Sequence, residues 1–101
     1  MIKVGEHITL DIIGTSKEYD PSVYEKVINK IAKAAKVGII NISKYEFSPQ
    51  GLTMVALLKE SHMSFHTFPE HGIISFDFFT CGRINPNVSL NILKKEINHS
   101  C

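Results

Sequence analysis

The segment from residue 59 to 72 concentrates side chains that can act as nucleophiles, acids and bases. It reads KESHMSFHTFPEHG and holds three of the five histidines of the chain, two serines and two glutamates. A second run, DFFTCG, follows at residues 77–82 and adds a thiol. A serine hydroxyl or a thiol beside a histidine is the arrangement that nucleophilic catalysis requires. The sequence therefore directs attention to these two runs as a candidate catalytic region.

The same segment also has the pattern of an ordinary strand. Apolar or small side chains alternate with others from residue 63 to 68, which predicts an extended segment with two different faces. On this interpretation each histidine is a half-buried residue with a satisfied hydrogen bond, and Cys81 is a small buried hydrophobe. Packing alone does not need so many titratable groups in one segment, so we favour a chemical role for them.

A metal site is a second interpretation, with His62, His66, His71 and Cys81 as the possible ligands. A spacing of four residues brings two histidines together on a helix, but Pro69 prevents a helix from continuing through this segment. On a strand, His62 and His66 share a face at a separation of about 13 Å, because each residue advances the chain by about 3.3 Å. One tetrahedral ion cannot bridge that distance, and we expect no metal site from these residues.

Four short motifs carry a resemblance to a known family. They are ESH at residues 60–62, HTFPE at 66–70, FTCG at 79–82 and FSPQGLT at 47–53. In type and spacing they resemble the prokaryotic class of S-adenosylmethionine decarboxylase proenzymes, and the likeness runs from the first expected strand to the last expected helix. Two positions depart from the usual family pattern, since Phe68 stands where relatives usually have tryptophan and Thr53 where many have serine.

The resemblance implies that the chain cuts itself between Glu60 and Ser61. The Ser61 hydroxyl attacks the preceding carbonyl carbon, and the amide becomes an ester. By the same resemblance, His66 removes the α-proton of Ser61, and the Thr53 hydroxyl assists processing. Cleavage gives a β chain of residues 1–60 and an α chain of residues 61–101, and Ser61 becomes a covalent pyruvoyl group, which is the implied cofactor.

The resemblance also implies the substrate, S-adenosylmethionine, and the roles of the remaining site residues. A pyruvoyl ketone accepts the electron pair released as carbon dioxide leaves. Cys81 then returns a proton to the α-carbon, a task suited to a thiol with a pKa near 8.5. Phe47 and Phe68 are suited to stacking on adenine, and Glu70 can accept the ribose hydroxyls. The product is the aminopropyl donor for spermidine synthesis.

Length and composition agree with one globular domain spanning residues 1–101. The chain is 44% hydrophobic and 21% charged, with a formal net charge of +1, which gives no reason to expect nucleic acid or an anionic membrane as partner. No apolar run reaches the roughly 18 residues that span a bilayer. The first residues lack the apolar core of a signal peptide, and two cysteines do not make a disulfide framework, so we expect a cytoplasmic protein.

Hydrophobic periodicity predicts five strands and two helices. The strands are expected at 7–13, 37–45, 52–58, 63–68 and 73–80; the helices are expected from Asp20-Pro21 to a stop at Gly38, and after an Asn85-Pro86 cap. Short connections between strands predict antiparallel pairing. The fold class is therefore α+β, a two-layer sandwich with a mainly antiparallel sheet and two helices on one face. An exposed edge strand promotes association, so we expect a dimer of cleaved αβ units or a covered edge.

Two other functions remain open at this point. One is a pyruvoyl-dependent decarboxylase of a free amino acid, arginine or ornithine, on the same scaffold. Phe68 and Glu70 favour the nucleoside substrate instead, because a free amino acid needs neither stacking nor a ribose acceptor. The other is a homologue that never cleaves and regulates an active partner. Retention of Ser61, His66 and Cys81 together speaks against that alternative.

Overall fold

The computed structural model describes residues 5–15, 19–81 and 84–97, and its elements follow the predicted order. The strands are β1 (Gly5–Ile13), β2 (Ile39–Glu46), β3 (Leu52–Leu58), β4 (Ser61–Phe68) and β5 (Ile73–Cys81). The helices are α1 (Pro21–Ala35) and α2 (Val88–Glu96), and a short 3₁₀ turn, η1 (Pro69–His71), joins β4 to β5. Most strands begin or end one or two residues outside the predicted limits.

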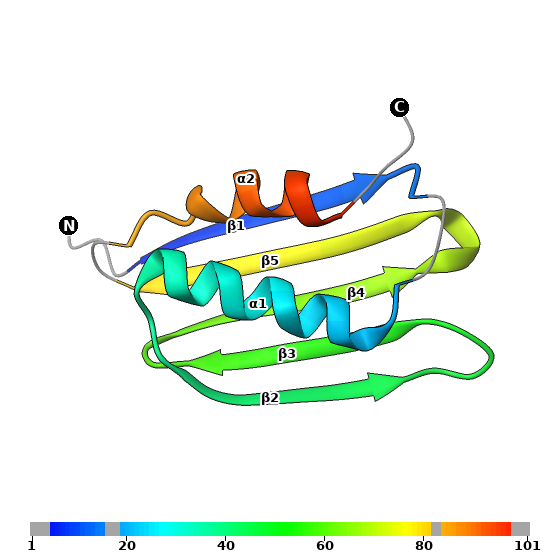
Figure 1. Cartoon of the computed structure of the whole chain (residues 1–101), viewed down its shortest axis with the longest axis horizontal. Coiled ribbons are helices and arrows are strands. Elements are labelled where there is room, and N and C mark those ends of the chain that lie inside the picture. The colour runs from blue at the N-terminus through cyan, green and yellow to red at the C-terminus, as the bar shows by residue number, and fades with distance from the viewer. Residues whose placement is uncertain (1–4, 16–18, 82–83, 98–101) are drawn as a thin grey trace.

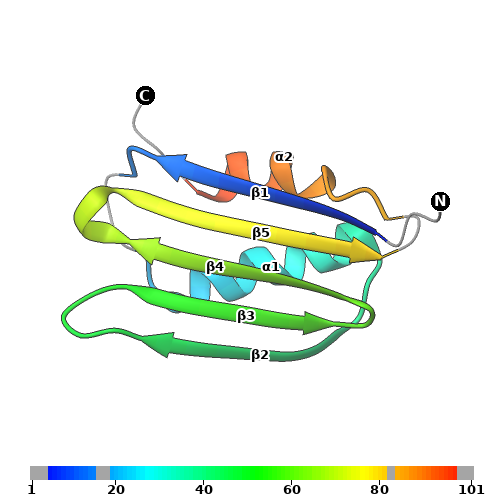
Figure 2. The same cartoon turned by 180° about the vertical axis from the view of Figure 1, so that it is seen from behind.

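The five strands form one antiparallel sheet in the order β1-β5-β4-β3-β2. Both helices lie on one face of it (Figure 1), and the view from behind shows the strands of the other face in front of the helices (Figure 2). This arrangement confirms the predicted α+β two-layer sandwich. We call the face turned away from the helices the open face. The candidate segment 61–68 forms the central strand, β4.

The core lies between the sheet and the helices. Period-two alternation turns Met63 and Phe65 of β4 and Phe78 of β5 toward α1, and each is fully buried. The helix contributes a buried stripe of Tyr24, Val27, Ile28, Ile31, Ala32 and Ala35. Burying each large side chain contributes about 1.5–3 kcal/mol, which holds the central strands rigidly under the open face.

Helix α1 starts as predicted but ends earlier. The Asp20 carboxylate accepts a hydrogen bond from the backbone N–H of Ser22 at 2.9 Å, so it is the N-cap. The predicted stop at Gly38 is wrong, because Lys36 already adopts the left-handed conformation (φ 60°) and donates its N–H to the carbonyl of Lys33. The predicted Asn85 cap is also displaced: its side chain accepts from the N–H of Asn87 in the turn before α2 begins.

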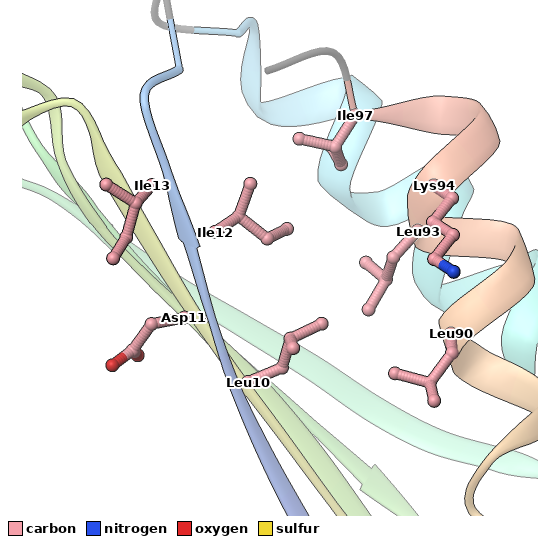
Figure 3. A pocket seen from close by; sticks show the side chains of 8 residues that line it. All are labelled: Leu10, Asp11, Ile12, Ile13, Leu90, Leu93, Lys94 and Ile97. Atoms are coloured by element: carbon pink, nitrogen blue, oxygen red, sulfur yellow. The ribbon is translucent and has the colours of Figure 1, made fainter. Parts of the chain in front are cut away.

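An apolar cavity of about 220 Å³ lies between strand β1 and helix α2 (Figure 3). Its lining residues are Leu10, Asp11, Ile12, Ile13, Leu90, Leu93, Lys94 and Ile97. Ser61, His66 and Cys81 are not among them.

Within the described ranges, neither helix is long and apolar enough to span a bilayer.

Candidate active site

Ser61 and Cys81 meet at one end of the sheet. Ser61 is the first residue of β4 and Cys81 the last of β5, and antiparallel pairing of these strands brings the two positions together. The backbone N–H of Cys81 donates to Oγ of Ser61 at 3.4 Å. The Ser61 side chain is 6% exposed, which excludes most water from its hydroxyl. Thr80 holds this end of β5 by donating its hydroxyl to the carbonyl of Ile84 at 3.0 Å.

Glu60, the residue before Ser61, has a strained backbone. It lies in the two-residue turn between β3 and β4 and adopts φ 65°, a region that side-chain-bearing residues rarely occupy. The neighbouring N–H of Lys59 donates to the carbonyl of Gly38 at 3.0 Å, which ties the turn to the segment before β2. A non-glycine residue in this conformation costs about 1–3 kcal/mol. We call Glu60, Ser61 and Cys81 the cleavage end.

Thr53 and His66 meet at the opposite end of the sheet. They are direct cross-strand partners on β3 and β4, and both side chains lie on the open face. The Thr53 hydroxyl lies 3.1 Å from Nδ1 of His66, within hydrogen-bonding distance. That contact orients the imidazole and leaves Nε2 available for proton transfer.

A groove of about 490 Å³ opens beside this pair. Its lining brings together five residues predicted from the sequence: Phe47, Thr53, His66, Phe68 and Glu70. Phe47 and Phe68 are 51% and 42% exposed, which is high for aromatic side chains. The volume of the groove falls within the range usual for small-molecule sites. We call this site the groove.

The cleavage end and the groove are separate within one chain. Ser61 and His66 lie five positions apart on the same extended strand, so about 16 Å separates their backbones at 3.3 Å per residue. Proton transfer requires a heavy-atom separation of about 3 Å. His66 therefore cannot act on Ser61 of its own chain while β4 remains a strand.

A third cluster lies between the two sites and was not predicted from the sequence. On the open face, Asp77 accepts a hydrogen bond from Ser64, and its other carboxylate oxygen faces Nε2 of His7 at 2.6 Å and of His62 at 3.7 Å. Burial raises the pKa of the Asp77 carboxyl, but the hydrogen bonds from Ser64 and His7 and the charges of both histidines outweigh it, and the net pKa is lowered. The sequence pattern that could have predicted this position of Asp77 is the alternation along β5, which puts Asp77 on the same face as Cys81.

Comparison with known proteins identifies the family. A family model described as S-adenosylmethionine decarboxylase matches residues 6–100. S-adenosylmethionine decarboxylase proenzyme 2 of Halalkalibacterium halodurans is 36% identical over 100 residues, which cover 96% of this chain and 79% of the relative. The S-adenosylmethionine decarboxylase proenzyme of Methanococcus vannielii is 43% identical over 84 residues, covering 81% and 69%.

A solved structure agrees with these sequence matches. The crystal structure of the adenosylmethionine decarboxylase from Aquifex aeolicus superposes with a TM-score of 0.82 at 30% identity, over 97% of this chain and 83% of that one. The fold and the sequence together define an enzyme of the decarboxylase class. The chain belongs to the S-adenosylmethionine decarboxylase family.

Proposed function

We propose that this chain cuts itself between Glu60 and Ser61 and then decarboxylates S-adenosylmethionine, yielding the aminopropyl donor for spermidine synthesis. The observation that carries the proposal is the cleavage end: a buried serine hydroxyl follows a strained residue and lies beside Cys81. The relatives' name, proenzyme, agrees with a chain that requires processing. We also expect the protein to act in the cytoplasm, as the sequence predicted.

The position of the proposed cut allows both fragments to stay in one fold. Residues 1–60 would retain β1, β2 and β3, and residues 61–101 would retain β4 and β5. In the sheet, β5 pairs with β1 and β4 pairs with β3, so the second fragment lies between strands of the first. Cutting the hairpin turn breaks no strand, and the fragments would remain hydrogen-bonded on both sides.

The residues around Ser61 fit a pyruvoyl group in its place. The Ser61 side chain lies in a position largely shielded from water, and the Cys81 N–H is a hydrogen-bond donor toward the position that Oγ now occupies. A pyruvoyl group there would supply an electron-withdrawing ketone for loss of carbon dioxide. Because the Cys81 backbone contacts Ser61, its thiol is our proposed carrier of the proton that returns to the substrate α-carbon.

We propose that two copies pair through their open faces and complete the site. A two-fold axis lying between the sheets and perpendicular to the strands reverses strand direction, so it sets the cleavage end of one copy opposite the groove of the other. His66 of one chain would then lie close enough to Ser61 of its partner to take up its α-proton. Within one chain, a separation of about 16 Å, or five strand residues, prevents that proton transfer. The open face also exposes apolar side chains suited to burial, Tyr45, Val55, Leu57 and Phe68.

The groove is our proposed binding site for the nucleoside part of S-adenosylmethionine. Phe47 and Phe68 offer exposed aromatic faces for adenine and for the sulfonium cation. Glu70, on η1 at the groove wall, offers a carboxylate for the two ribose hydroxyls. Among the described residues, no feature of the groove favours a free amino acid as substrate.

The first prediction concerns the cut itself. Intact-mass spectrometry of the purified parent is expected to find two fragments, 1–60 and 61–101, the second with a pyruvoyl end. Ser61→Ala is expected to remain one chain with no release of carbon dioxide, because the nucleophile is gone. A parent that stays uncut would contradict the proposal and favour a non-cleaving regulator. Turnover of arginine or ornithine, without turnover of S-adenosylmethionine, would contradict the substrate.

The second prediction tests the strain at Glu60. Glu60→Gly relaxes the left-handed backbone, so it is expected to stabilise the uncut chain and slow cleavage roughly tenfold. Glu60→Ala is the matched control, because it removes the same carboxylate but keeps the strain. The rate is the appearance of fragments over time after synthesis in a cell-free system. Equal rates for the glycine and alanine variants would show that strain does not drive the cut.

A further inference from the structure

We propose that His7, His62 and Asp77 form a binding site for a divalent transition-metal ion of the Zn²⁺ type. The three side chains come from adjacent strands, β1, β4 and β5, and project from the open face. Their three ligand atoms all lie within 4.8 Å of one another. Two imidazoles and one carboxylate are a ligand set that Zn²⁺ and related ions bind well.

The geometry is close to that of a bound ion. Oδ2 of Asp77 lies 2.6 Å from Nε2 of His7 and 3.7 Å from Nε2 of His62. Ligand atoms around a tetrahedral zinc ion lie about 3.3 Å apart, given bond lengths of about 2.0–2.1 Å. The observed distances lie on either side of that value, so small side-chain rotations would suffice. Three protein ligands leave one position for water or another ligand.

The surroundings hold the ligands in place. Ser64 donates to Oδ1 of Asp77, which leaves Oδ2 as the single oxygen facing both histidines. Such a hydrogen bond to the far oxygen of a ligating carboxylate is typical of metal sites. Phe79 stacks on His62 with ring centroids 5.7 Å apart and meets His7 edge-on at 6.0 Å. One side of the cluster is therefore apolar.

This set differs from the one that the sequence led us to reject. The rejected site needed His62 and His66, which lie at different levels of β4. Here His62 pairs across strands instead, because His7 and His62 both oppose Phe79 in the sheet register. The site therefore depends on the order of strands β1, β5 and β4, which sequence spacing does not reveal.

The test measures metal binding directly and does not depend on cleavage or turnover. Purified protein is treated with chelator, desalted and titrated with Zn²⁺ by calorimetry and with Co²⁺ by visible absorption. One ion per chain is expected, with the absorption of nitrogen and oxygen ligands. His7→Gln, His62→Gln and Asp77→Asn are each expected to weaken binding by roughly 10- to 100-fold or more. His71→Gln, on the exposed turn η1, is the matched control and should bind as the parent does.

Several results would overturn the site. One is an absence of binding by the parent, which would leave the cluster as a hydrogen-bonded network alone. A second is unchanged affinity in all three variants. A third is a Co²⁺ spectrum with thiolate charge-transfer bands, which would assign the ion to a cysteine. Circular dichroism confirms that each variant is folded, and the titration of the parent decides the proposal even where a variant is not. A metal site would survive an uncut parent, so its failure and that of the proposed decarboxylase are separable.

Discussion

Co-expression of two inactive variants, Ser61→Ala and His66→Ala, is expected to restore cleavage of one of them. In the proposed dimer, a mixed pair would set the intact Ser61 of the His66→Ala chain opposite the intact His66 of the Ser61→Ala chain. That site would be complete, whereas the second site of the same dimer would lack both residues. With random pairing, about half of the His66→Ala chains are expected to gain a pyruvoyl end, whereas neither variant forms one alone.

The reason for this expectation is the separation between the two ends of β4. His66 and Thr53 lie at the groove, about 16 Å from Ser61, and no rearrangement short of unfolding the central strand brings them together. Different affinity tags on the two chains allow each to be weighed separately by mass spectrometry. Co-expression of Ser61→Ala with Ser61→Ala,His66→Ala is the control, since no chain in it carries the nucleophile. If the first pair yields no pyruvoyl-ended fragment, the proposal of a site shared between two chains is wrong.

Cys81→Ala is expected to separate processing from turnover. The variant keeps the backbone N–H that contacts Oγ of Ser61, so the chain should still cut itself. Loss of the proposed proton donor is expected to lower kcat for decarboxylation of S-adenosylmethionine by about 10²- to 10⁴-fold, the usual contribution of a general acid. Carbon dioxide release per pyruvoyl-containing chain is the measurement, because it corrects for incomplete cleavage.

The control for this experiment is Cys101→Ser, which changes the other cysteine of the chain. It should cleave and decarboxylate as the parent does. Cys81→Ser tests the role of acidity, since a hydroxyl is a much weaker acid than a thiol and should restore little activity. Parental kcat in Cys81→Ala would assign the proton to another group, and loss of cleavage would instead point to a role for the thiol in processing.

Local sequence patterns predicted the order of the strands and helices and the residue types of the site. Alternation along residues 63–68 and 73–80 predicted two strands, each with one buried apolar face, because burial of one sheet face imposes a period of two. Asp20-Pro21 identified the start of α1, since capping is a local interaction between neighbours. Helix ends were less predictable. Lys36 adopts the left-handed C-cap conformation expected of Gly38, because a residue other than glycine can also end a helix in this way.

Local patterns did not predict which of these residues lie together in the folded chain. Ser61 and His66 are close in the sequence but far apart in space, because a strand advances about 3.3 Å with each residue. Conversely, Ser61 meets Cys81 across a strand pair, and Asp77 meets His7 across 70 residues of chain. Such contacts depend on the order and register of the strands, which are set by packing of the whole sheet on its helices. Local sequence patterns contain no record of that order.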